Sequence, residues 1–112
     1  MSYADLIEYT RRASALLKAM SNERRLLILC HLAEGERSVG ELEALVGLSQ
    51  SALSQHLARL RRDRLVRTRR AAQSIIYSLE GNEALGVMDA LRHLYVVDTA
   101  ARGKDIAGSA AD

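Results

Sequence analysis

The sequence predicts a mainly α-helical domain with a small β-hairpin, arranged as a winged helix-turn-helix of five helices and a two-stranded wing. Apolar residues follow a helical period up to residue 64 and again after residue 82, whereas the period is that of strands between residues 65 and 79. In addition, two short helices meet at the tight turn Val46–Ser49, a short distance before the hairpin. A chain of 112 residues is long enough for one hydrophobic core.

The first two helices are expected before residue 36. Apolar residues recur at helical spacing over 6–20, and Ser21 or Asn22 then stands where it can cap the second helix. The second helix, RRLLILCHLAEG, is apolar around more than half of its circumference and is ended by Gly35. A helix that is apolar on most sides must be surrounded by protein, so we expect it at the centre of the core.

The next two helices form the predicted helix-turn-helix. Ser38 is followed three residues later by Glu41, which is the spacing of a capping box and marks the start of a short third helix. Gly47 ends this helix, and Ser49 is positioned to cap the fourth. We expect the fourth helix to end at Arg62 or Arg64.

The wing and a last helix follow. Two β-prone runs, Leu65–Arg69 and Ser74–Leu79, are separated by a basic turn at Arg70–Gln73, which predicts a two-stranded hairpin. The last helix is expected to start after Asn82, a residue suited to cap it, and to end near Ala101. The sequence therefore divides into a domain over residues 1–101 and a flexible tail over 102–112 that is rich in small and polar residues.

Positive charge is concentrated in one part of the chain. Residues 49–79 contain seven arginines and one acidic residue, Asp63, although the net charge of the whole chain is only +2. A basic block of this kind is typical of a polyanion-binding surface, but clustered arginines also serve solubility. Charge alone therefore leaves nucleic-acid binding open.

The polar face of the fourth helix favours DNA. On a wheel of about 100° per residue, Leu53, Leu57 and Leu60 form an apolar edge, and short polar side chains occupy the other side. Serine and glutamine can hydrogen-bond to base edges, the small Ala58 permits close approach to a groove, and the helix N-terminus can meet a phosphate. A polar face that merely contacts solvent is the alternative. The residues expected to bind double-stranded DNA are Ser49, Gln50, Ser51, Ser54, Gln55, His56, Arg59, Arg62, Arg67, Arg69, Arg70 and Gln73.

The chain also resembles a known family. The stretches RLLILCHLAEGERSVGELEALVGLSQSALSQHLARLR and LVRTRRAAQSIIYSL are similar to the ArsR/SmtB family of bacterial winged-helix repressors, and the similarity covers about residues 14–97. The pieces SQSALSQHLxxLR and TRRxxQxIxYSL most resemble the branch of nodulation repressors and of sulfur- or redox-responsive repressors. The resemblance implies a repressor that binds an imperfect inverted repeat as a homodimer and occludes a promoter.

The resemblance also implies that the first and last helices join the homodimer. These helices carry more apolar residues than one small domain can readily bury against its own core. Pairing across a two-fold axis would cover them and set two reading helices about 34 Å apart, which is one turn of DNA. The residues expected at the dimer interface are Leu6, Ile7, Leu16, Leu85, Met88, Leu91, Leu94 and Tyr95.

The metal sites of the family are not expected in this chain. The resemblance places Ser38, Val39 and Gly40 where many relatives bind metal through a Cys-Val-Cys pair, and neither serine nor glycine supplies a thiolate. Asp89 and His93 match part of another family site, but a solvated pair one helical turn apart is the more ordinary interpretation. No metal and no cofactor is therefore predicted.

Cys30 is the single cysteine of the chain and the one candidate redox site. Redox-responsive relatives pair a cysteine here with a second one in the last helix, where the resemblance places Val96. Without that partner no intrachain disulfide can form, and periodicity predicts that Cys30 is mostly a core residue. We therefore expect DNA binding to be insensitive to disulfide-forming oxidants.

Other classes of function are less well supported. No nucleophile, base and orienting group occur together, and there is no glycine-rich phosphate loop, so an enzyme is not expected. The absence of an apolar run near the roughly 20 residues that span a bilayer, and of a secretory signal, predicts a cytoplasmic protein. A protein-interaction module that uses the basic hairpin and a thiol- or metal-responsive sensor of the same fold stay as alternatives. The sequence names neither the operator nor a small-molecule effector.

Overall fold

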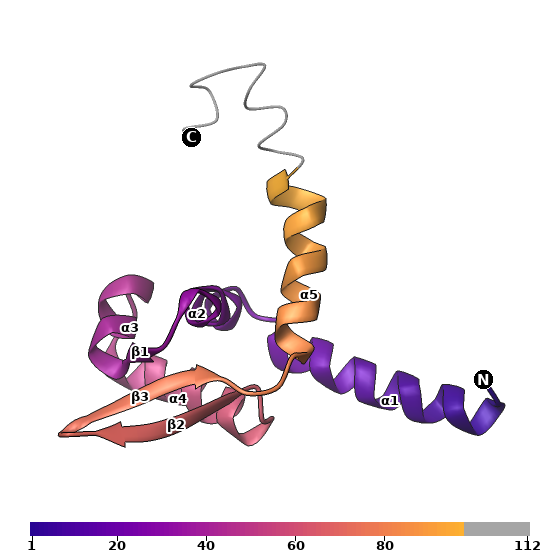
Figure 1. Ribbon diagram of the computed structural model, residues 1–112, viewed down its shortest axis with the longest axis horizontal. Coiled ribbons are helices and arrows are strands. Elements are labelled where there is room, and N and C mark those ends of the chain that lie inside the picture. Colours follow the sequence, from indigo (N-terminus) through magenta and orange to yellow (C-terminus); the bar gives the residue numbers. More distant parts are fainter. Residues whose placement is uncertain (98–112) are drawn as a thin grey trace, which may run out of the picture.

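The structure is a computed structural model that describes residues 1–97. Figure 1 shows a central body of α2, α3, α4 and the sheet, from which α1 and α5 extend in different directions. The predicted tail and the predicted helix end near Ala101 lie outside the described residues. In order, the elements are α1 (Tyr3–Met20), α2 (Glu23–Glu34), β1 (Arg37–Ser38), α3 (Val39–Val46), α4 (Gln50–Arg62), β2 (Val66–Ala71), β3 (Ser74–Leu79), α5 (Glu83–Arg92) and a π-helical turn (His93–Val97).

Side chains cap most of the helices where the sequence predicts it. The Ser38 hydroxyl accepts a hydrogen bond from the Glu41 N–H, and the Glu41 carboxylate accepts one from the Ser38 N–H, which confirms the capping box of α3. Asn22 caps α2, and Ser49 caps α4. Asn82 occupies the N-cap position of α5 but its side chain makes no capping hydrogen bond, so this part of the prediction is wrong.

The hydrophobic core is built around α2, as predicted. Ile28 and Leu29 of this helix are completely buried, and Leu32 one turn further on is almost so. The helix contacts α3, α4, α5 and β3, which explains why it is apolar on most sides. Other fully buried side chains that complete this core are Leu42, Leu53, Leu60 and Val66.

The wing is a three-stranded antiparallel sheet in the order β1–β3–β2, not the predicted two-stranded hairpin. Arg37 of β1 pairs with Tyr77 of β3, and a strand of two residues is too short to show a strand period in the sequence. The hairpin between β2 and β3 is longer than predicted, because its loop is only Ala72–Gln73. Arg70, predicted in the turn, therefore lies in β2.

The prediction that Cys30 is a core residue is wrong, because its side chain is exposed. Cys30 lies on the side of α2 that faces α5, where it lines an apolar depression together with Leu26, Met88 and Leu91. Figure 1 shows that α5 rises away from α2, so this side of α2 is only partly covered within one chain. Periodicity could not reveal this, because an apolar side looks the same whether or not a neighbour covers it.

The length and hydrophobicity of the described helices decide whether one of them could span a membrane. Among residues 1–97, no helix is both long enough and apolar enough to cross a bilayer. The longest helix, α1, has 18 residues, and its first ten positions from Tyr3 on are exposed polar and apolar residues in mixture.

Candidate nucleic-acid interface

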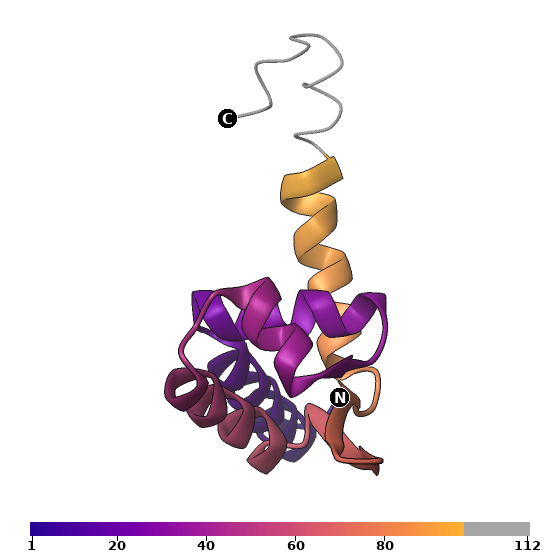
Figure 2. The ribbon, with the colours of Figure 1, turned by 90° about the vertical axis from the view of Figure 1, so that its left-hand side faces the viewer.

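The fourth helix presents a polar face to solvent. Leu53 and Leu57 are buried against the core, and on the other side of α4 Ser51, Ser54 and Gln55 are exposed. The predicted division of this helix into two faces is therefore confirmed. Figure 2 shows α4 and the wing together along the lower side of the molecule, with α5 at the top, so a partner can reach both elements at once.

The turn between α3 and α4 is held by two local features and one contact from α2. Gly47 adopts a left-handed conformation with φ of 73°, which glycine tolerates without steric cost. The Ser49 hydroxyl accepts a hydrogen bond from the Ala52 N–H at 3.1 Å and so caps α4. Arg24 of α2 donates a hydrogen bond to the Val46 carbonyl at 3.0 Å. This carbonyl is one of the last four of α3, which have no hydrogen-bond donor within the helix. No sequence pattern indicates this last contact, because its residues are far apart in the chain.

The wing carries basic side chains, one of which is paired within the protein. The Arg69 guanidinium donates two hydrogen bonds to the Glu36 carboxylate, at 2.7 and 3.1 Å. These hydrogen bonds lower the pKa of Glu36 and raise the pKa of Arg69. Of the other predicted wing contacts, Arg67, Arg70 and Gln73 are exposed and form no side-chain hydrogen bond or ion pair among residues 1–97, although the charge of Arg67 also helps to lower the pKa of Glu36.

Three of the predicted contacts on α4 are partly engaged inside the protein. Arg59 and Arg62 form ion pairs with Asp63, at 3.1 and 3.5 Å. His56 is half-buried, and this burial lowers its pKa, helped by the positive charges of Arg25 and Arg24 on α2. His56 is therefore neutral at neutral pH and is a weaker candidate for phosphate than the fully exposed residues of the same helix.

Two exposed arginines near the end of α4 are absent from the predicted contacts. Arg61 and Arg64 both belong to the basic block, but the helical wheel does not place them on the polar face. Neither forms an ion pair within the part of the chain that the structure describes. The charge count was the signal that could have found them, because it includes every arginine whatever its direction.

The residues considered for metal binding are not assembled into a site in the described chain. The Ser38 hydroxyl is used in the cap of α3, and Asp89 pairs with Arg92 at 3.4 Å. His93 is exposed one turn after Asp89. Over residues 1–97, no group of three or more His, Cys, Asp or Glu residues is close enough to hold a metal ion.

Exposed apolar side chains lie on α1, on α5 and on the π-helical turn that follows α5. Leu6 and Ile7 are about half exposed, and Leu94 is 63% exposed, although leucine and isoleucine are ordinarily buried. Leu16, Met88 and Leu91 are partly buried. The two remaining residues predicted at a dimer interface, Leu85 and Tyr95, are exposed as well.

Proteins of known function resemble this chain over most of its length. It is 52% identical over 95 residues to the transcriptional activator HlyU of Vibrio cholerae, covering 85% of this chain and 88% of the relative. It is 52% identical over 87 residues to the nodulation protein NolR of Rhizobium meliloti, covering 78% and 71% of the two chains. The crystal structure of the transcriptional repressor BigR from Xylella fastidiosa superposes with a TM-score of 0.78 at 39% identity, covering 85% of this chain and 97% of that one.

A polar helix face exposed beside a basic three-stranded wing defines a class, the winged-helix DNA-binding regulators of transcription. Residues 22–68, which span α2 to the start of β2, match the family described as bacterial regulatory protein, arsR family. The chain belongs to the arsR family. It is accordingly a DNA-binding transcriptional regulator and not an enzyme.

Proposed function

We propose that this regulator binds an inverted-repeat DNA operator as a homodimer and represses transcription by occluding the promoter. The observation that carries the proposal is the exposed polar face of α4, which lies beside the wing on one side of the molecule (Figure 2). Both elements can therefore meet the same duplex. A bacterial operator lies in the cytoplasm, so the regulator acts there.

Base reading is assigned to the middle of the polar face. Gln55 can present its amide to an adenine, with one donor and one acceptor, and Ser51 can pair with several base edges. Ala58 is exposed one turn after Ser54, and its small side chain lets the helix approach the floor of the major groove. Exposed arginines on the wing, such as Arg70, supply phosphate contacts that do not depend on sequence.

The homodimer is supported by exposed apolar side chains on α1 and on the turn that continues α5. Leu6, Ile7 and Leu94 expose about half or more of their side chains in a single chain, and they lie on two helices that project from the body (Figure 1). Pairing of two chains across a two-fold axis would bury these side chains in both chains. It would also place two α4 helices about one DNA turn apart, so that each reads one half of an inverted repeat.

A pair of substitutions tests the assignment of base reading and phosphate contact. Gln55→Ala should reduce the discrimination between the DNA upstream of the regulator's own gene and a shuffled duplex, because each lost base contact costs roughly 1–3 kcal/mol. Arg70→Ala should weaken the binding of both duplexes alike, because a phosphate contact carries no sequence information. Fluorescence anisotropy titrations of both labelled duplexes measure the two effects. Parental binding of both duplexes by both variants would show that the reading face and the wing are wrongly assigned.

A further inference from the structure

A basic depression lies where the end of α4 meets the base of the wing. Its three arginines, Arg61, Arg64 and Arg67, are exposed, and none forms an ion pair within residues 1–97. In this they differ from Arg59, Arg62 and Arg69 nearby, which have carboxylate partners. The depression is lined by Arg61, Arg64, Val66, Arg67, Thr68 and Glu80. Three guanidinium groups and one carboxylate leave it with a net positive charge, which suits an anion.

Arg64 has a backbone conformation that arginine seldom adopts. Its φ is 61°, in the left-handed region, where the Cβ atom of any residue other than glycine is crowded. The Arg64 N–H donates to the Arg61 carbonyl, and the Leu65 N–H donates to the Leu60 carbonyl. This is the Schellman arrangement, in which the left-handed position after the helix is usually glycine.

The ends of α3 and α4 differ in the residue that occupies the left-handed position. At the end of α3, Gly47 takes the left-handed position with φ of 73°. At the end of α4 an arginine takes it, at a steric cost that a glycine would remove. The strained position is therefore occupied by an exposed cation that forms no ion pair among residues 1–97.

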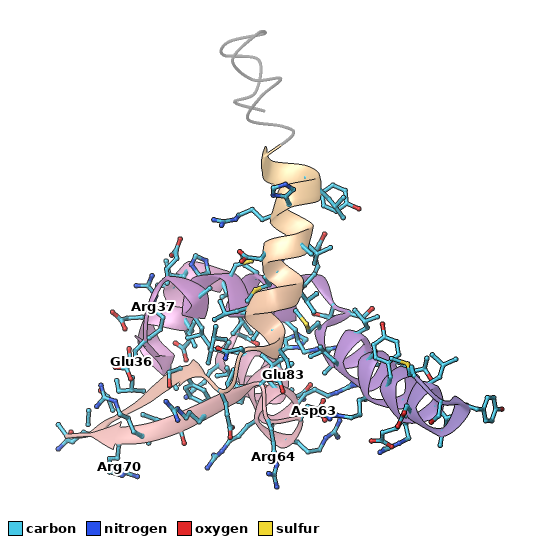
Figure 3. The ribbon with its side chains drawn as sticks, turned by 45° about the vertical axis from the view of Figure 1, so that its right-hand side comes forward. Glu36, Arg37, Asp63, Arg64, Arg70 and Glu83 are labelled. Atoms are coloured by element: carbon cyan, nitrogen blue, oxygen red, sulfur yellow. The ribbon has the colours of Figure 1, made fainter. Side chains whose placement is uncertain are left out.

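We propose that Arg64, together with Arg61 and Arg67, binds a phosphate of the DNA backbone and so extends the interface past the C-terminal end of the reading helix. Figure 3 shows the Arg64 and Arg70 side chains extending from the same side of the molecule, so one duplex can reach both. A guanidinium group binds a phosphate through paired N–H donors. The inference rests on the proposed DNA-binding function, and it adds contacts at a place which the polar face of α4 does not include.

The test compares the parent protein with Arg64→Gly, Arg64→Lys and the control Arg92→Ala. Arg92 is an exposed arginine on α5, away from α4 and the wing, so its loss changes the net charge equally. Affinity for a labelled random-sequence duplex of about 30 base pairs, long enough for two half-sites, is measured at several salt concentrations, and the thermal midpoint is measured in parallel. Arg64→Gly should bind more weakly, with a salt slope shallower by about 0.9 for each lost phosphate contact. Its thermal midpoint should rise, because the strain is relieved.

The control variants separate the loss of a local phosphate contact from a general change in net charge. Arg64→Lys and Arg92→Ala should both keep the parental salt slope, the first because it keeps the charge and the second because it lies elsewhere. A higher thermal midpoint of Arg64→Gly with an unchanged slope would overturn the inference. Inorganic phosphate at constant ionic strength should not compete, and competition that depends on Arg64 would make this a site for a free anion. A parent protein that binds no duplex even at low salt would refute the proposed function itself.

Discussion

His56 of α4 makes the stability of the domain depend on pH. It is half-buried between α4 and α2, and burial together with Arg25 and Arg24 lowers its pKa in the folded protein below the ordinary value of 6.5. In the unfolded chain the imidazole is free to take up a proton near that ordinary value. The folded state therefore binds fewer protons than the unfolded state once the pH falls below 6.5. Stability is present above this pH and is lost as the pH falls toward the folded-state pKa.

We predict that the urea midpoint of unfolding decreases between about pH 7.5 and 5.5, a range that the carboxylates hardly influence because they titrate lower. His56→Gln should remove most of this decrease while keeping a polar side chain of similar size. Urea titrations followed by circular dichroism measure both proteins at each pH. An equal decrease in parent and variant would show that His56 does not cause the pH dependence.

Single residues were predicted well where one helix decides their environment, and poorly where neighbours decide it. The wheel correctly placed Leu53 inside and Gln55 outside, because both follow from the geometry of α4 alone. The partial burial of His56 depends on the packing of α2 against α4, and the pairing of Arg69 depends on Glu36, which is 33 positions away. A periodic pattern contains no information on such contacts.

At the scale of elements, the hairpin of the wing contains an unusual loop residue. Ala72 is the first residue of the two-residue loop and has φ of 57°. Type II′ turns have a positive φ at this position, match the twist of the two strands and favour glycine there. An alanine in the left-handed region costs roughly 1–2 kcal/mol. The wing therefore keeps a small amount of strain in its loop.

Ala72→Gly should raise the free energy of unfolding by roughly 0.5–1 kcal/mol, since relief of the strain exceeds the extra backbone entropy that glycine loses on folding. Ala71→Gly is the matched control, because Ala71 lies in β2 with a negative φ, and we expect it to destabilise the protein. Thermal unfolding of the three proteins measures the difference. Destabilisation by both substitutions would contradict the assigned loop conformation.

The type and order of the elements followed from the sequence, whereas some boundaries did not. Caps such as Ser38 and Ser49 are local signals, and they marked the starts of α3 and α4 correctly. The third strand, Arg37–Ser38, forms only because the hairpin provides an edge with which to pair. A segment of two residues shows no period of its own, so this pairing could not be predicted.

At the scale of the whole molecule, the arrangement of the helices favours a dimer. α1 and α5 project from the body, and apolar side chains on both are exposed (Figure 1). The sequence indicated this surface through its surplus of apolar residues, and the structure describes which of them a single chain leaves uncovered. The prediction that a second copy covers them comes only from the family resemblance, because one chain contains no information on the symmetry of its assembly.

Leu94→Asp should dissociate the dimer, because it places a charge in the apolar surface that pairing would bury. Leu94 is 63% exposed, so the substitution should leave the fold of one chain intact. Leu45→Asp is the control, since Leu45 is 44% exposed but lies on α3, outside the expected interface. Analytical ultracentrifugation should find dimers for the parent and for Leu45→Asp, and monomers for Leu94→Asp. A stable monomeric parent at micromolar concentration would contradict the proposed assembly.

Selection of duplexes from a random-sequence library by the intact protein, followed by sequencing, shows whether two copies of α4 read an inverted repeat. Two copies of α4, related by a two-fold axis, should each read the same bases in opposite orientations. We expect the enriched duplexes to share an inverted repeat whose half-sites have centres about 10 base pairs apart, or a multiple of one helical turn. A library that stays random after repeated rounds, although the protein binds DNA at low salt, would show that the protein does not recognise an inverted-repeat operator.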